Sequence, residues 1–219
     1  MIKFKQLPRG WHDISFEKGL KALEADNEVE RLAILSDRSA EEIRKSTDID
    51  SIYYFTHAIT FLNSLPDAAF PRSVKMGKDR ILFPFVNYSD EFDLGDVAVG
   101  QVEDMQAILV KMNKEFVRDE ERELTSAEML KICPHVVAIY LQGIIEDYDG
   151  QKAMMLVKRV QKELSFKDCV SMGYFFFLRL GALMTGQQSA WQNRASRLRR
   201  LRLACSGLMQ RLGFTARLT

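Results

Sequence analysis

Apolar residues recur at helical spacing over most of the chain, and two capping boxes mark where helices begin. Ser39 stands three residues before Glu42, and Thr125 stands three residues before Glu128. At this spacing the two side chains cap each other's backbone N–H groups. Apolar positions at i, i+3, i+4 and i+7 predict amphipathic helices. The segments predicted to be helical are 14–37, 39–46, 48–66, 99–116, 127–144, 150–164 and 165–184.

Several polar residues and prolines predict where these helices start and stop. Ser15 is a candidate N-cap for the first helix, and Ser165 with Asp168 for the last. Pro66 is expected to end the helix that starts near residue 48, because a proline cannot continue the backbone hydrogen bonding. Pro134 lies inside a helical pattern, so a kink or a split is expected there.

The pattern changes to that of a β-hairpin in the middle of the chain, over 70–85. Two short strands flank a turn near Gly77, Lys78 and Asp79, and Pro84 closes the second strand. We expect an exposed two-stranded ribbon that needs packing from elsewhere to be stable. The predicted fold class is therefore mainly α, a helical bundle with a small β-hairpin insertion.

Four regions follow from these patterns. They are an N-terminal helical region (1–66), the hairpin with its loop (67–95), a helical core (96–186) and a C-terminal arm (187–219). With 219 residues, 47% of them hydrophobic and 28% charged, the chain is long and apolar enough for one large domain or two small ones.

The compartment is predicted to be the cytoplasm. The odd number of cysteines, three, fits a reducing environment, and the N-terminus lacks the apolar stretch of a secretory signal. The longest apolar run, near residues 169–184, is interrupted by Arg179 and is shorter than the roughly 20 residues of a spanning helix. We therefore expect no membrane span.

Charge is distributed unevenly along the chain. The totals are 31 basic and 30 acidic residues, a net charge of +1. The last acidic residue is Asp168, and the chain from Cys169 to Thr219 contains eight arginines and no lysine. The remainder holds 31 − 8 = 23 basic residues against 30 acidic ones, a net charge of −7. Such asymmetry is typical of an interaction tail.

The arm is predicted to be an amphipathic helix from about Gln187 to Leu212. A heptad-type stripe that includes Cys205 forms the apolar seam of this helix. The other residues of the seam are predicted to bind a partner: Trp191, Leu198, Leu201, Leu208 and Leu212. Arginines on the other faces are candidates for contact with an anion or an acidic partner: Arg194, Arg197, Arg199, Arg200 and Arg202. The stripe is too short for a free coiled coil, so it must dock on something.

Several targets remain open for the arm. A protein partner ranks first, because helix-in-groove binding uses this spacing and arginine suits carboxylate pairing. Non-specific DNA contact ranks second, since few aromatic residues are present for base stacking. A membrane surface ranks third. The arm can also pair with the acidic remainder of its own chain or of a neighbouring copy in a homo-oligomer.

No residue set has the spacing of a known catalytic or metal site. Walker-type loops, G-x-S-x-G and H-E-x-x-H are absent from the sequence. Asp147 and Asp149 lack the order of a calcium loop and are read as a turn before Gly150. Cys133 and His135 lack an orienting partner, and Cys133 is read as a core residue. We expect no enzyme, no cofactor and no metal.

Five segments follow one another in the first half of the chain. These are WHDISFEKGLKAL, RLAILSDRSAEEI, TFLNSLP, RSVKMGKDRILFPF and DLGDVAVGQVEDM. Over about residues 11–110 this order resembles proteins of the structural-gene clusters of tailed phages and prophages of Bacteroidetes-type bacteria, some described as tail assembly chaperones. The chain beyond Asp119 departs from that pattern.

The resemblance implies a non-enzymatic role in tail or virion morphogenesis through contacts with other phage proteins. As a tail assembly chaperone, the protein would act in the host cytoplasm and leave before the particle is complete. As a permanent virion component, it would form a ring at the neck, tail or baseplate. There, its basic arm would contact a neighbouring subunit or DNA.

Overall fold

The computed structural model describes residues 7–66, 69–83, 97–117 and 124–184. Over these ranges the chain forms eight α-helices and one two-stranded antiparallel sheet, which confirms the predicted fold class. The first helices are α1 (Phe16–Glu24), α2 (Glu28–Ser36), α3 (Ala40–Ser46) and α4 (Ile49–Ala58). The hairpin is β1 (Ser73–Met76) and β2 (Asp79–Leu82). The remaining helices are α5 (Val99–Val117), α6 (Ser126–Ile145), α7 (Gly150–Glu163) and α8 (Phe166–Met184).

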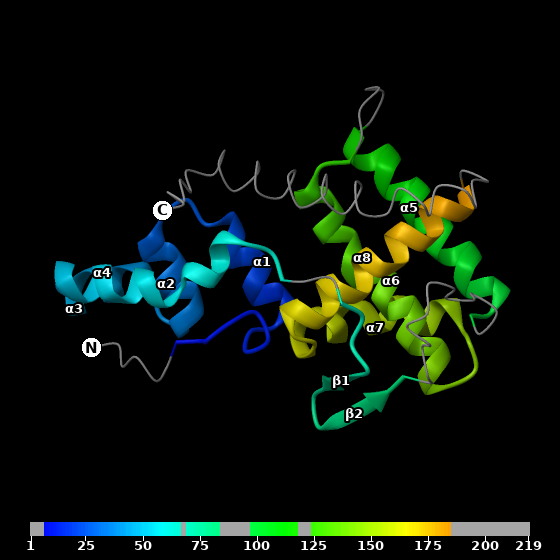
Figure 1. The fold of residues 1–219 in the computed structure, drawn as a ribbon, viewed down its shortest axis with the longest axis horizontal. Coiled ribbons are helices and arrows are strands. Elements are labelled where there is room, and N and C mark those ends of the chain that lie inside the picture. The colour runs from blue at the N-terminus through cyan, green and yellow to red at the C-terminus, as the bar shows by residue number, and fades with distance from the viewer. Residues whose placement is uncertain (1–6, 67–68, 84–96, 118–123, 185–219) are drawn as a thin grey trace.

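Helix α6 is the centre of the larger group of helices, with α5, α7 and α8 packed around it (Figure 1). Most of its side chains are buried, including an unbroken run from Ile132 to Pro134 and another from Val136 to Gln142. Of the helices in the described ranges, α6 alone is long and apolar enough to cross a membrane. Its burial is that of a core helix, so the described residues contain no clear membrane span.

The expected break at Pro134 does not split α6, which runs as one helix from Ser126 to Ile145. Proline removes one backbone hydrogen bond and strains the preceding turn. Packing of α5, α7 and α8 on α6 outweighs that cost. Both predicted capping boxes, at Ser39 with Glu42 and at Thr125 with Glu128, are present in full.

Two predicted helices are shorter than expected. The segment 14–37 is divided into α1 and α2, because Asn27 accepts a hydrogen bond from the Glu30 backbone N–H and starts a new helix. The helix expected to end at Pro66 ends at Ala58 and is followed by a 3₁₀ turn, Thr60–Asn63. There the Thr60 hydroxyl donates to the carbonyl of His57 (3.0 Å), which helps the chain to turn early.

The N-terminal helices are attached to the α6-centred group through the start of α8. The backbone N–H of Phe16 donates to the carbonyl of Leu164 (3.0 Å), and that of Phe166 donates to Ile14 (2.8 Å). Phe166 stacks on Trp11, with 4.3 Å between the ring centroids. As predicted, Ser15 caps α1, and the Ser165 hydroxyl accepts from the backbone N–H of Asp168.

The hairpin was expected to be an exposed ribbon, and this is wrong for β1. Its Val74 and Met76 side chains are buried, and β1 contacts α7. The strands pair from Ser73 opposite Leu82 to Met76 opposite Asp79. The alternation of buried and exposed side chains in β1 reflects the two faces of a strand, one of which lies on the helical core.

The turn of the hairpin depends on Gly77, whose φ of 62° lies in the left-handed region. We expect Gly77→Ala to lower the free energy of unfolding by about 1–2 kcal/mol, the cost of this backbone conformation for an L-residue. Gly77→Asn is the matched control, because asparagine tolerates left-handed φ. Urea unfolding followed by circular dichroism measures both; equal losses would contradict the backbone explanation.

Candidate functional site

A groove lies between α5 and α7 in the described part of the chain. Its volume is about 1090 Å³. Helix α5 contributes one stripe: Asp104, Ala107, Ile108 and Lys111. The start of α7 contributes a second: Asp149, Gly150, Gln151, Met154, Met155 and Lys158. Ile139 of α6 lies at the base. We call this feature the α5–α7 groove.

Both stripes follow helical spacing, so each presents a continuous face to the groove. On α7 the side chains that pack on the core are a different set: Ala153, Leu156, Val157 and Val160. Met154 and Met155 lie beside that face and remain 41% and 76% exposed. Methionine side chains are flexible and polarizable, and they are common on surfaces that bind other proteins. The middle of the groove is therefore apolar and accessible.

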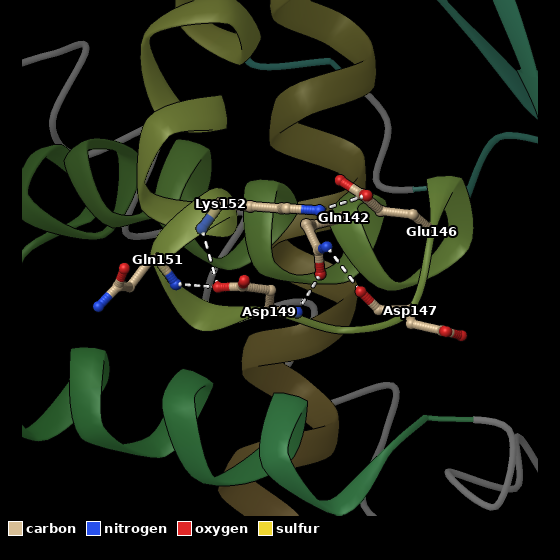
Figure 2. Close-up of polar contacts among 6 residues, drawn as sticks. All are labelled: Gln142, Glu146, Asp147, Asp149, Gln151 and Lys152. Carbon is tan, nitrogen blue, oxygen red and sulfur yellow. Dashed lines mark hydrogen bonds and ion pairs between the residues drawn. The ribbon is translucent and has the colours of Figure 1, made fainter.

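The α6–α7 connection holds one end of the groove in place (Figure 2). Gln142, which is buried in α6, donates through its side-chain amide to the carbonyl of Asp147 (3.0 Å). The same amide accepts from the backbone N–H of Asp149 (2.9 Å). Asp149 in turn accepts from the backbone N–H groups of Gln151 (2.8 Å) and Lys152 (3.2 Å). The segment before Gly150 is thus a turn that connects α6 to α7, as predicted, and Asp149 in addition caps α7.

The Asp149 cap can be tested directly. We expect Asp149→Ala to lower the free energy of unfolding by about 1 kcal/mol, because the first N–H groups of α7 lose their acceptor. Asp149→Asn keeps a capping oxygen and should cost much less. Thermal unfolding of both variants measures the difference. A similar loss for asparagine would show that the carboxylate charge matters, and not the cap.

Asp104 joins α5 to this connection. The Tyr148 hydroxyl donates to its carboxylate, and burial together with that hydrogen bond raises the pKa of Tyr148. Gly150 allows the close approach, since a Cβ there would lie 2.5 Å from the Oδ2 atom of Asp104. The N-terminal ends of α5 and α7 therefore meet at this end of the groove, where Asp104 contacts Tyr148 and Gly150, the two neighbours of Asp149 in the chain.

The other end of the groove carries two lysines, Lys111 on α5 and Lys158 on α7. His135, one turn before Ile139 on α6, lies near Lys111. Burial lowers the pKa of His135, and the charge of Lys111 lowers it further, while Glu115 acts in the opposite direction. His135 is therefore neutral at pH 7, and the positive charge at this end comes from the lysines.

The described cysteines are unsuited to nucleophilic chemistry. Cys133 and Cys169 are free thiols buried between α6 and α8. Burial raises the pKa of both thiols, so neither is a thiolate near neutral pH. Cys133 is a core residue, as predicted. In the part of the chain that the structure describes, no three His, Cys, Asp or Glu side chains are grouped closely enough to hold a metal ion.

The binding residues predicted from the sequence belong to the C-terminal arm, which lies outside the described residues. This applies to the apolar seam from Trp191 to Leu212 and to the arginines from Arg194 to Arg202. The α5–α7 groove was missed by the sequence analysis. The sequence feature that could have revealed the groove is the pair Met154–Met155, which lies outside the apolar face that α7 turns toward the core.

Comparison of the chain with protein-family models, with curated proteins and with solved structures gives no match.

Proposed function

We propose that this chain is a non-enzymatic protein of phage tail morphogenesis that holds another assembly protein in the α5–α7 groove, as a tail assembly chaperone does. The observation that carries the proposal is the exposed pair Met154 and Met155 in an open groove. Exposed apolar side chains beside one another mark a surface that another protein covers. The resemblance of residues 11–110 to tail-cluster proteins supports the identity of the client.

The shape of the groove favours a macromolecular client over a small substrate. Small-molecule sites are concave and enclose most of the ligand's surface. Here two helical stripes flank an open channel, and Met155 is exposed over most of its surface. The client would be a tail-tube or tape-measure protein in the host cytoplasm.

A second candidate function is a permanent place in the virion, as a subunit of a neck, tail or baseplate ring. The distribution of charge favours it, because the acidic remainder of one copy complements the eight arginines near the end of the next. In such a ring the arm would contact a neighbouring subunit or DNA.

Mass spectrometry of purified particles separates the two functions. A chaperone is expected to be expressed during tail assembly, to be required for tails, and to be absent from finished particles. A ring subunit is expected in the particle at a symmetric copy number. Normal tails from a phage that lacks the gene would contradict both.

A further inference from the structure

The α5–α7 groove has opposite charges at its two ends. Asp104 and Asp149 lie where the N-terminal ends of α5 and α7 meet. Lys111 follows Asp104 by seven residues, about two helical turns, and Lys158 follows Asp149 by nine. Helix α5 runs antiparallel to α6, because Gln101 near its start donates to the carbonyls of Ile139 and Tyr140, whereas Lys111 further along lies near His135. Helix α7 follows α6 after a short turn and packs on it, so it also runs back along α6. The lysines therefore share the far end.

We infer that the groove binds an amphipathic helix of a partner protein in one direction, parallel to α5 and α7, with basic side chains in its first turn and acidic ones in its last. This inference rests on the proposed function and specifies the chemistry of the client. The first turn of the bound helix lies beside Asp104 and Asp149, and the last turn lies beside Lys111 and Lys158.

One contribution favours a helix as the occupant, and two favour this direction. The apolar centre, formed by Ile108, Met154 and Met155, accepts side chains spaced i, i+3 or i+4, and i+7. Charged side chains of the bound helix pair with opposite charges at both ends, and complementary charges fix orientation more than they add affinity. The macrodipole acts in the same sense, since its positive N-terminus faces carboxylates and its negative C-terminus faces lysines.

The same charges disfavour the chain's own arm as the occupant. The sequence from Cys169 onward has eight arginines and no acid. Such a segment can pair with Asp104 and Asp149, but it has no carboxylate for Lys111 and Lys158. A partner helix that carries both signs matches the groove at both ends.

Two synthetic peptides test the direction. They share a leucine stripe and the same composition; one has lysines in the first turn and glutamates in the last, and the other has the reverse order. A hydrocarbon staple on the outer face keeps both peptides helical, so that the different placement of charged residues near their ends does not change their helix content. Binding to the full-length protein is measured by fluorescence anisotropy. The acidic-first peptide makes the same ion pairs only when it lies in the opposite direction, where its macrodipole opposes the charges at both ends of the groove. We therefore expect the basic-first peptide to bind about threefold to tenfold more tightly.

The variant Lys111→Glu with Lys158→Glu is the internal control. It makes both ends acidic, so each peptide has one matched and one mismatched end, and the preference should disappear. Equal binding of both peptides to the natural protein, preference for the acidic-first peptide, or binding of neither overturns the inference.

Other occupants are separate outcomes. Tighter binding of a peptide with this chain's residues 187–212 than of the basic-first peptide would make the arm the occupant and overturn the inference. A homodimer in sedimentation analysis that the Lys111→Glu, Lys158→Glu variant abolishes would make a second copy the occupant and overturn it as well. If the direction test fails, the proposed function still stands provided that a photoreactive amino acid placed at position 155 cross-links to a tail protein in cells. Absence of that cross-link removes the proposed function, whatever the peptides show.

Discussion

Replacing Phe166 with alanine is expected to lower the free energy of unfolding by about 3–5 kcal/mol. Phe166 is fully buried at the start of α8. Its ring stacks on Trp11 and on Phe16, with centroid distances of 4.3 and 5.4 Å. Truncation leaves a cavity where the N-terminal helices join the α6-centred group. A loss of this size is a large fraction of the 5–15 kcal/mol that stabilises a typical domain.

Phe177→Ala is the matched control, because Phe177 lies in the same helix and is only partly buried. Its loss should be clearly smaller in the same urea titration. The comparison separates the packing of one ring from the general cost of removing a phenylalanine from α8. Equal losses would show that packing of Phe166 on Trp11 and Phe16 stabilises the fold no more than a partly buried phenylalanine does.

Replacing Met154 and Met155 together with aspartate is expected to weaken partner binding by at least about 30-fold, the effect of losing one interface hot spot. Two carboxylates in the apolar centre of the groove would have to be buried without partners. The free energy of unfolding should change by no more than about 1 kcal/mol, about 0.5 kcal/mol for each substitution, because both side chains are substantially exposed in the free protein. Co-purification with co-expressed tail proteins, together with thermal unfolding, measures the two effects.

Val110→Asp is the control for that variant. Val110 is 43% exposed on α5, similar to Met154 at 41%, but it is not part of the groove lining. Binding should be unchanged. A loss of co-purification for Val110→Asp as large as for the methionine pair would mean that α5 and α7 bind through a surface other than the groove.

Local signals in the sequence predicted the helices well where neighbouring residues decide the structure. The boxes at Ser39 and Thr125 start α3 and α6 as expected, since each is formed within four residues. The split that was one of the two outcomes expected at Pro134 does not occur, because tertiary packing of three helices, which no local pattern contains, keeps α6 continuous. Burial of Val74 and Met76 likewise depends on α7, more than 70 residues further along the chain.

The groove was beyond local reasoning for the same reason. Asp104 and Gly150 come from separate helices, and only the fold brings them into contact. A helical projection of α7 alone would still have set Met154 and Met155 apart from its core-facing side chains. The arm's predicted seam and arginines lie outside the described residues and stay predictions.

Site-specific photo-cross-linking tests the central proposal most directly, that another tail-assembly protein occupies the α5–α7 groove. A benzophenone amino acid is placed at position 155 or, as control, at position 110, and cells are irradiated during tail assembly. The proposal predicts a covalent adduct with one tail protein from position 155 and none from position 110. No adduct from position 155, or equal adducts from both, would contradict it.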